Sequence, residues 1–285
     1  MYKAVVSMAK KNEIKRENFK NNFLKNIIVR FDYTGIAEVE LDKIIAKVKS
    51  IFKEDGYDKL NEGYLTEMDF QFQDPESVEA EGLPIKEIRK KKAYVFTNSQ
   101  KGIECKLSTQ FVLVSIYSQK YISFAEYSQT LMNVIRMIKS NVEFLRCFRF
   151  GIRKINKCII KNIEDLNQYF EVEFFKIYGL NRKFEPKLFE SKDCFKDEKY
   201  NVNLTRMVIM GEYENDVAYQ VVLDSDIYIT ENDNISNLFN NNDEITIMNE
   251  KLFELYKEAL TEYFITELGK ENFSDEHIIG VEPNE

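Results

Sequence analysis

The sequence predicts an α+β protein made of two similar units, each a mostly antiparallel sheet with helices packed on one face. Segments in which apolar and polar residues alternate, as in half-buried strands, occur in both halves of the chain, and so do segments with apolar residues at helical spacing. The order strand, helix, several strands and long helix occurs in residues 1–143 and again in residues 144–285. One continuous sheet shared across the midpoint is the alternative.

The first unit begins with a polar, basic segment, residues 1–26, that forms a short helix or a flexible arm. A strand is predicted over 27–33, and six apolar residues at three- and four-residue spacing predict a helix over 41–52. Residues 64–72 alternate as a half-buried strand does. Residues 74–92 contain two prolines, so we expect a long exposed loop there. Three strands near 94–97, 102–107 and 111–117 follow, and then a helix over 124–138 with a capping box at Ser123 and Glu126.

The second unit begins with residues 145–160, which form one long strand or two strands with a bend at Gly151. Asn162 is expected to cap a helix over 166–177. A polar loop is predicted over 179–200. The later elements are a hairpin of strands 203–213 and 217–230, a helix over 248–268 that stops at Gly269, and a frayed acidic tail over 270–285.

Composition restricts the class of protein. The net charge of −8 argues against a uniformly basic nucleic-acid binder. The four cysteines form no C-x-x-C pair, which indicates reduced, mostly buried thiols. Residues 1–26 lack an apolar signal-peptide core, and no run of apolar residues is long enough to span a membrane. We therefore expect a cytoplasmic protein that does not associate with membranes.

Residues for common catalytic mechanisms are scarce. His277 is the only histidine, which disfavours Ser-His and Cys-His catalysis and histidine-ligated metals. No P-loop or G-x-G-x-x-G motif occurs. One catalytic alternative is a metal-dependent nuclease, in which Glu104 and Lys106 would act with Asp69 or Asp74. We expect a non-enzymatic protein without a cofactor or a bound metal.

The central segment 146–156 is basic and aromatic and contains one glycine. In a strand, Arg149, Gly151 and Arg153 lie on the same face. Two guanidinium groups beside a position without a side chain are suited to a carboxylate or a phosphate. The alternative is structural: the arginines pair with Asp224 and Asp226 of a neighbouring strand, and Gly151 marks a bulge or a bend.

Residues Arg149, Gly151, Arg153, Ile155 and Asn156 fit the pattern R-x-G-x-R-x-I-N. This pattern resembles the signature of a sporadically distributed family of uncharacterised prokaryotic proteins. Lys154 departs from the pattern, because an aromatic residue is commoner there. Further points of resemblance are residues 222–228 and the last helix, through Phe253, Tyr263, Phe264, Leu268 and Gly269. The resemblance implies an α+β fold and a bacterial accessory gene, and it implies no catalytic residue.

These observations favour a non-enzymatic protein that recognises another macromolecule: an adaptor, inhibitor or sensor of an accessory system such as phage defence or toxin–antitoxin. We expect the partner to be another protein, encoded nearby. Nucleic acid is an alternative partner, through basic segments 10–25 and 86–92, and a sensor of an anionic small ligand or nucleotide is a further alternative. The expected contact residues are Arg149, Gly151, Arg153, Asp224, Asp226, Arg89, Lys90, Lys91 and Lys92.

Overall fold

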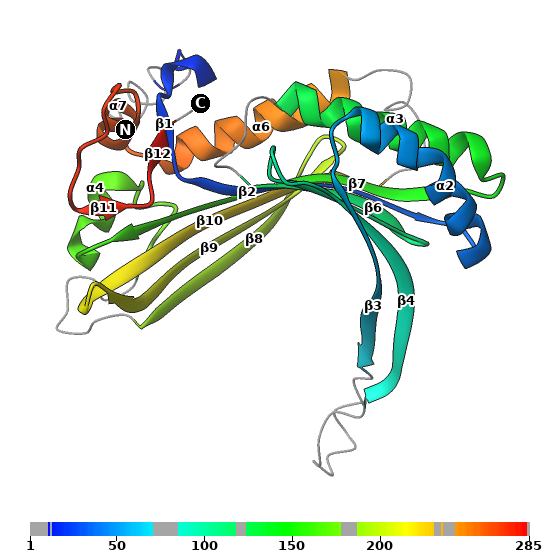
Figure 1. Ribbon diagram of the computed structural model, residues 1–285. Coiled ribbons are helices and arrows are strands. Elements are labelled where there is room, and N and C mark those ends of the chain that lie inside the picture. The colour runs from blue at the N-terminus through cyan, green and yellow to red at the C-terminus, as the bar shows by residue number, and fades with distance from the viewer. Residues whose placement is uncertain are drawn as a thin grey trace, which may run out of the picture.

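The computed structural model describes residues 11, 13–70, 85–117, 124–177, 187–230, 235 and 243–283. These residues form a ten-stranded antiparallel sheet with helices on one face, which confirms the α+β class (Figure 1). Nine of the strands lie in the order β3 (Lys59–Phe70), β4 (Ile85–Asn98), β5 (Ile103–Ser108), β6 (Phe111–Tyr117), β2 (Leu24–Thr34), β7 (Arg146–Ile160), β10 (Asp216–Ile229), β9 (Tyr200–Tyr213) and β8 (Leu188–Asp197). The tenth, β11 (Ile278–Ile279), lies off this path and pairs with β7.

Strands β2 and β7 pair at the centre and make the sheet continuous between the two halves of the chain. From this pair, each half follows a similar path outward. In the first half β2 is innermost, β6 pairs with it, and β5, β4 and β3 follow outward. In the second half β7 is innermost, β10 pairs with it, and β9 and β8 follow outward. The residues that β2 and β7 contribute to the uncovered face therefore come together from both halves.

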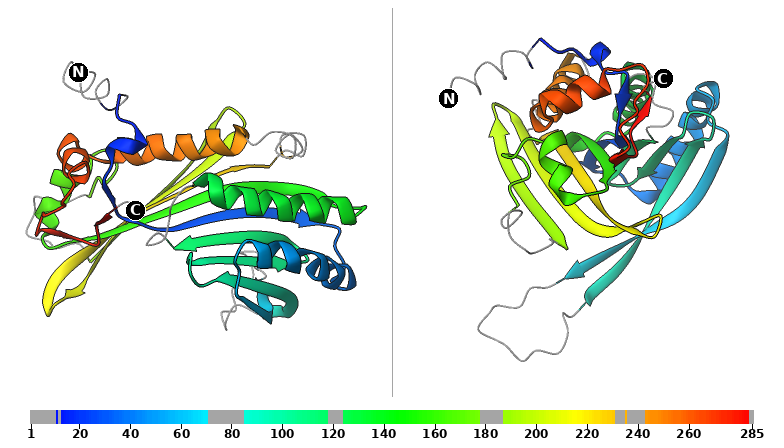
Figure 2. Two further views of the ribbon diagram at one scale, coloured as in Figure 1. Left: turned by 45° about the horizontal axis from the view of Figure 1, so that its top comes forward. Right: turned by 90° about the vertical axis from the view of Figure 1, so that its left-hand side faces the viewer.

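The helices cover one face of the sheet (Figures 1 and 2). α2 (Glu38–Glu54) and α3 (Phe124–Asn141) lie over the first half, and α6 (Asp243–Ala259) lies over the second. The predicted stripe of α2 is buried, through Leu41, Ile44, Ile45, Val48 and Phe52. One core cluster contains residues of both halves, including Phe31 of β2 and Phe150 of β7, whose ring centroids are 6.2 Å apart.

A second core lies beneath the chain ends. It is built around α7 (Glu262–Leu268), α4 (Leu166–Tyr169) and the 3₁₀ turn η3 (Ile163–Asp165). The expected flexible arm and frayed tail are wrong for the described parts of these segments, because Phe19, Phe23 and Ile278 are buried there. The ends also contain η1 (Arg16–Asn18), β11 (Ile278–Ile279) paired with β7, and β1 (Asn21–Asn22) paired with β12 (Glu282–Pro283).

Two predicted loops contain strands. Residues 85–92 belong to β4, which pairs with β3 in a long hairpin that bends away from the helices (Figure 1), while residues 71–84 lie outside the described part of the chain. Residues 188–197 form the edge strand β8, whose side chains are mostly exposed on both faces. An edge strand of this kind shows no apolar alternation, so its sequence resembles that of a loop.

Three further boundaries differ from the predictions. The last helix is two helices, because Thr261 caps a new one: its Oγ1 accepts a hydrogen bond from the Phe264 amide at 3.2 Å. The helix predicted over 166–177 is the single turn α4. β7 is one uninterrupted strand in which Gly151 pairs regularly, and the two irregularities in its pairing with β2 lie near Phe148 and near Lys25. Ser123 lies outside the described residues.

All four cysteines are free, and Cys105 and Cys158 are buried. No helix in the described parts of the chain is long and apolar enough to cross a membrane.

Candidate functional site

The site lies on the uncovered face of the sheet, at the junction of β2, β7 and β10. Strand alternation places Arg149, Gly151 and Arg153 on this face, as predicted. In the register of β2 with β7, Arg30 is opposite Gly151 and Asp32 is opposite Arg149. In the register of β10 with β7, Asp226 is opposite Arg153.

Arg149 forms the central ion pair of the site. Its Nη2 donates to both carboxylate oxygens of Asp226, at 3.0 and 2.8 Å, and its Nη1 lies 3.5 Å from Asp32 Oδ2. Its guanidinium carbon also lies 4.6 Å from the ring centroid of Tyr228, a cation–π distance. Arg149 is therefore held by carboxylates from two strands and by an aromatic ring.

Two further arginines are held in the same way. Arg153 donates from Nε and Nη2 to the two oxygens of Asp224, at 2.8 and 2.5 Å, in a bidentate pair. Arg30 donates to Asp32 Oδ1 at 2.7 Å and stacks over the ring of Phe111 at 4.4 Å. The expected pairing of the two β7 arginines with Asp224 and Asp226 is thus present.

Gly151 provides the space for the Arg149 guanidinium. A Cβ atom at this position would lie 3.0 Å from Nη2 of Arg149 and 3.0 Å from Cβ of Tyr228. Cβ atoms rarely approach other atoms so closely in close-packed proteins. The glycine of the central motif therefore accommodates an arginine side chain, and it produces no bulge or bend.

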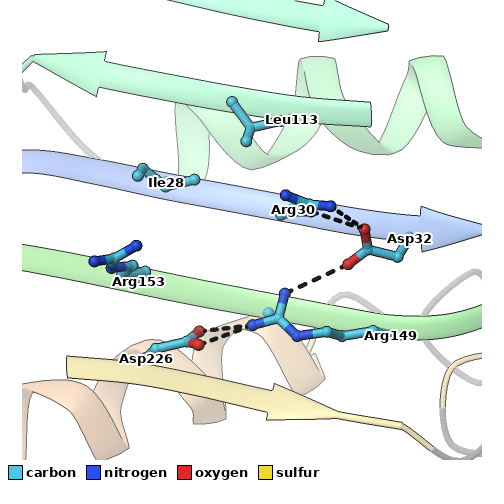
Figure 3. Close-up of a pocket in the computed structure, with 8 residues that line it drawn as sticks. Ile28, Arg30, Asp32, Leu113, Arg149, Arg153 and Asp226 are labelled. Atoms are coloured by element: carbon cyan, nitrogen blue, oxygen red, sulfur yellow. Dashed lines mark hydrogen bonds and ion pairs between the residues drawn. The ribbon is translucent and has the colours of Figure 1, made fainter. Parts of the chain in front are cut away.

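These residues enclose a cavity of about 310 Å³. It is lined by Ile28, Arg30, Asp32, Leu113, Arg149, Gly151, Arg153 and Asp226, and most of these are labelled in Figure 3. The arginines are the more exposed partners: the Arg153 and Arg30 side chains are 46% and 41% exposed, against 11% for Asp224 and 7% for Asp32. Asp32 and Asp224 therefore form a buried layer beneath the more exposed guanidinium groups of Arg30 and Arg153, whereas Arg149 and Asp226 are similarly exposed, at 24% and 18%.

The pKa shifts follow from this layering. Burial raises the pKa of Asp226, and its effect outweighs the lowering by Arg149 and Arg153. The hydrogen bonds to Asp224 raise the pKa of Arg153, so Arg153 remains a cation. The site thus combines three fixed positive charges with at least one carboxylate whose ionisation is made costly by burial.

The basic segment 89–92 lies away from this cavity. It belongs to β4, which β5, β6 and β2 separate from β7. Lys92 forms ion pairs with Asp42 at 2.9 Å and with Glu62 at 3.3 Å. Its pKa is raised by its hydrogen bond with Tyr94 and then by those with Asp42 and Glu62. The side chains of Arg89 and Lys90 lie outside the described part of the structure. The predicted contact residues therefore do not all belong to one site.

The residues of the nuclease alternative do not form a site. Glu104 and Lys106 pair with each other at 3.6 Å on β5. The register places Glu104 across from Thr97, and Thr97 across from Lys59, at the opposite end of β3 from Asp69. Ten residues of strand separate Lys59 from Asp69, or roughly 30 Å. Asp74 lies outside the described residues, within which no group of three or more His, Cys, Asp or Glu is placed to hold a metal.

Sequence reasoning missed Arg30 and Asp32 as site residues. The strand that contains them was predicted, and its alternation already placed both on the polar face. The available signal was the presence of two opposite charges within an otherwise apolar strand. Their contact with Arg149 depends on the pairing of β2 with β7, which the sequence pattern does not specify.

No protein-family model and no curated protein matches this chain. Among solved structures, it is similar to the S. pombe Pct1 RNA triphosphatase in complex with the Spt5 CTD. The identity is 6%, the match covers 89% of this chain and 87% of that chain, and the TM-score is 0.13. A likeness at this TM-score carries no argument about fold or function.

Proposed function

We propose that this protein recognises another protein without catalysing a reaction, through the uncovered face of its sheet around Arg30, Arg149 and Arg153. The observation that supports the proposal is the layering of charge on that face. Buried carboxylates hold partly exposed arginines in fixed positions. Arginine is enriched in protein interfaces, and a side chain that is already ordered loses less entropy on binding.

The charge balance favours a protein over a nucleic acid as the partner. Each arginine of the site has a carboxylate partner, and the whole chain carries a net charge of −8. Nucleic-acid binding depends on an excess of positive charge that neutralises phosphates along a backbone. A mixed pattern of opposite charges is suited to a complementary protein surface.

The biological setting is proposed on the sequence resemblance alone. On that basis the protein is an adaptor, inhibitor or sensor of a bacterial accessory system such as phage defence or toxin–antitoxin. A protein encoded nearby is the first partner to test.

Affinity capture from the native host tests the proposal. Wild-type protein should retain a stoichiometric protein partner, and Arg30→Ala or Arg153→Ala should reduce the amount retained. Lys49→Ala is the matched control, because Lys49 is exposed on α2, the helix side of the sheet. Thermal unfolding should confirm that all variants are folded. Equal capture by the arginine variants and the control would refute the proposed contact face, and capture of no protein would refute the proposed function.

A further inference from the structure

We propose that the arginine cavity binds the phosphoryl group of a small phosphorylated molecule. This inference goes beyond the proposed function, because it concerns a small ligand and needs no partner protein. It rests on the donors that the ion pairs leave free, on their placement on two strands, and on the size and charge of the cavity.

Each arginine keeps an unused donor. Arg153 uses Nε and Nη2 for Asp224, Arg30 uses Nε and Nη2 for Asp32, and Arg149 uses Nη2 for Asp226 with Nη1 directed to Asp32. Nη1 of Arg30, Nη1 of Arg153 and Nε of Arg149 therefore have no hydrogen-bond partner within the described ranges. A guanidinium group has five N–H donors, so these pairings leave capacity for a ligand.

The arrangement of the arginines favours a tetrahedral anion. Figure 3 shows Arg30 on β2 and Arg149 and Arg153 on β7, around one stretch of the sheet face. A carboxylate is best bound by one fork of two parallel donors. A phosphoryl group carries three strong acceptor oxygens and about −1.5 to −2 charges near neutral pH, so it can accept from three separate arginines.

The cavity has the size and charge for such a group. Its volume of about 310 Å³ lies at the lower end of the range for small-ligand sites. The lining includes three arginines against Asp32 and Asp226, and Asp224 balances the third charge from beneath Arg153. The net charge of the group is therefore zero, and the more exposed side chains of Arg30 and Arg153 present the positive charge to the cavity. Asp224 lies beneath Arg153 and fixes it, so Arg153 does not have to be ordered when a ligand binds.

Gly151 lies among the three arginines in this lining. A side chain at this position would occupy the space of the Arg149 guanidinium and would narrow the cavity. Glycine is used where a ligand or another group must approach the backbone closely. The motif Arg149-x-Gly151-x-Arg153 thus contributes two arginine donors and, at Gly151, the space that the Arg149 guanidinium occupies beside the cavity.

Isothermal titration calorimetry of the full chain tests the inference. The probes are inorganic phosphate, AMP and a hexose phosphate, with adenosine and acetate as matched ligands that lack a phosphoryl group. Sodium chloride at equal ionic strength controls for screening. We expect AMP to bind and adenosine not to bind. Binding of inorganic phosphate, AMP and the sugar phosphate alike would identify the phosphoryl group itself as the ligand. Binding of AMP alone or of the sugar phosphate alone would show that the nucleoside or the sugar is recognised together with the phosphoryl group.

Two variants locate the binding site. Arg153→Gln and Arg30→Gln should each weaken binding by about 10- to 100-fold, as expected for loss of a hydrogen bond to a charged group. Lys196→Gln should leave affinity unchanged, because Lys196 is exposed on β8, three strands from β7. Binding of no phosphorylated probe, stronger binding of acetate than of phosphate, or equal loss in Lys196→Gln would each overturn the inference. None of these results bears on capture of a protein partner, so the two proposals fail separately.

Discussion

A Cβ atom at Gly151 would lie 3.0 Å from Nη2 of Arg149, the atom that donates both hydrogen bonds to Asp226. Gly151→Ala should therefore displace the guanidinium and weaken its ion pair. We expect the free energy of unfolding to fall by about 1–3 kcal/mol, as for other overpacked positions. Urea denaturation measures this change.

Gly211→Ala is the control for that experiment. Gly211 lies on β9, and a Cβ atom there would meet nothing within 4 Å. Its replacement should leave stability unchanged or raise it by about 0.5–1 kcal/mol, because glycine loses more backbone entropy on folding than alanine does. Equal losses in the two variants would show that the contact of a Cβ atom with the Arg149 guanidinium does not decide the stability of Gly151→Ala.

The sequence predicted the elements whose apolar residues face one side only. The stripe of α2 and the hairpin of β9 and β10 were visible because apolar residues recur at helical spacing in α2 and at alternate positions in the two strands. The hairpin turn was also predicted, at residues 214–216 between two alternating segments, and Glu214 and Asn215 adopt positive φ angles of 53° and 71° there. β8 was missed because it is an edge strand with little burial on either face.

The site was predicted in part, for a related reason. Arg149 and Arg153 share a face by alternation, and Asp224 and Asp226 share a face on the strand that pairs with theirs. The place of β2 beside β7 was not predictable in the same way. β2 lies more than a hundred residues before β7, and no local pattern indicates that Asp32 would contact Arg149. Pairing of distant strands depends on the whole sheet and its helices.

Asp226 gives a prediction for the pH dependence of stability. Because burial raises its pKa above the ordinary value of 3.8, the folded state holds this proton more tightly than the unfolded state does. Its contribution to stability is therefore complete below the unfolded pKa and is lost as the pH rises through the folded pKa. The difference in free energy of unfolding, wild type minus Asp226→Asn, should fall as the pH rises from below 3.8 through the folded pKa.

Denaturant titrations of both proteins over that pH range measure this difference. Loss of the hydrogen bonds to Arg149 lowers the stability of the variant by a similar amount at every pH. The pKa of Asp226 is therefore tested by how the difference in free energy of unfolding changes with pH, and its absolute size does not test it. A difference that grows as the pH rises would mean that the ion pair with Arg149 outweighs burial and that the pKa of Asp226 is lowered.

Lys154 gives a prediction with the opposite pH slope. It lies on the helix-facing side of β7, opposite Ser225 of β10, and it is buried. Burial lowers its pKa well below the ordinary value, and Arg16 adds to the effect. Replacing buried charged groups by apolar side chains of similar volume is often stabilising, by about 1–4 kcal/mol. We expect Lys154→Met to be more stable than wild type near neutral pH.

The advantage of Lys154→Met should shrink in alkaline solution. With a lowered pKa in the folded state, the unfolded chain binds more protons between the folded pKa and 10.5, so wild-type stability rises with pH over that interval. The difference in free energy of unfolding between Lys154→Met and wild type should therefore be smaller at about pH 9 than at about pH 6. A variant less stable than wild type at both values would indicate a packing or hydrogen-bonding role for the amine.

Thr261 separates the last two helices, and its removal should destabilise their junction. Its Oγ1 accepts from the amide of Phe264 at 3.2 Å and donates to the carbonyl of Gln168 at 2.6 Å, so it caps α7 and ties it to α4. Thr261→Ala should lower the free energy of unfolding by about 1 kcal/mol, as for other N-caps. Thr266→Ala, within α7, is the control: its hydroxyl donates to the carbonyl of Glu262 within the same helix, and alanine is the better helix former. If both variants lost equal stability in urea denaturation, the cap would have no special role and helix content alone would explain the effect.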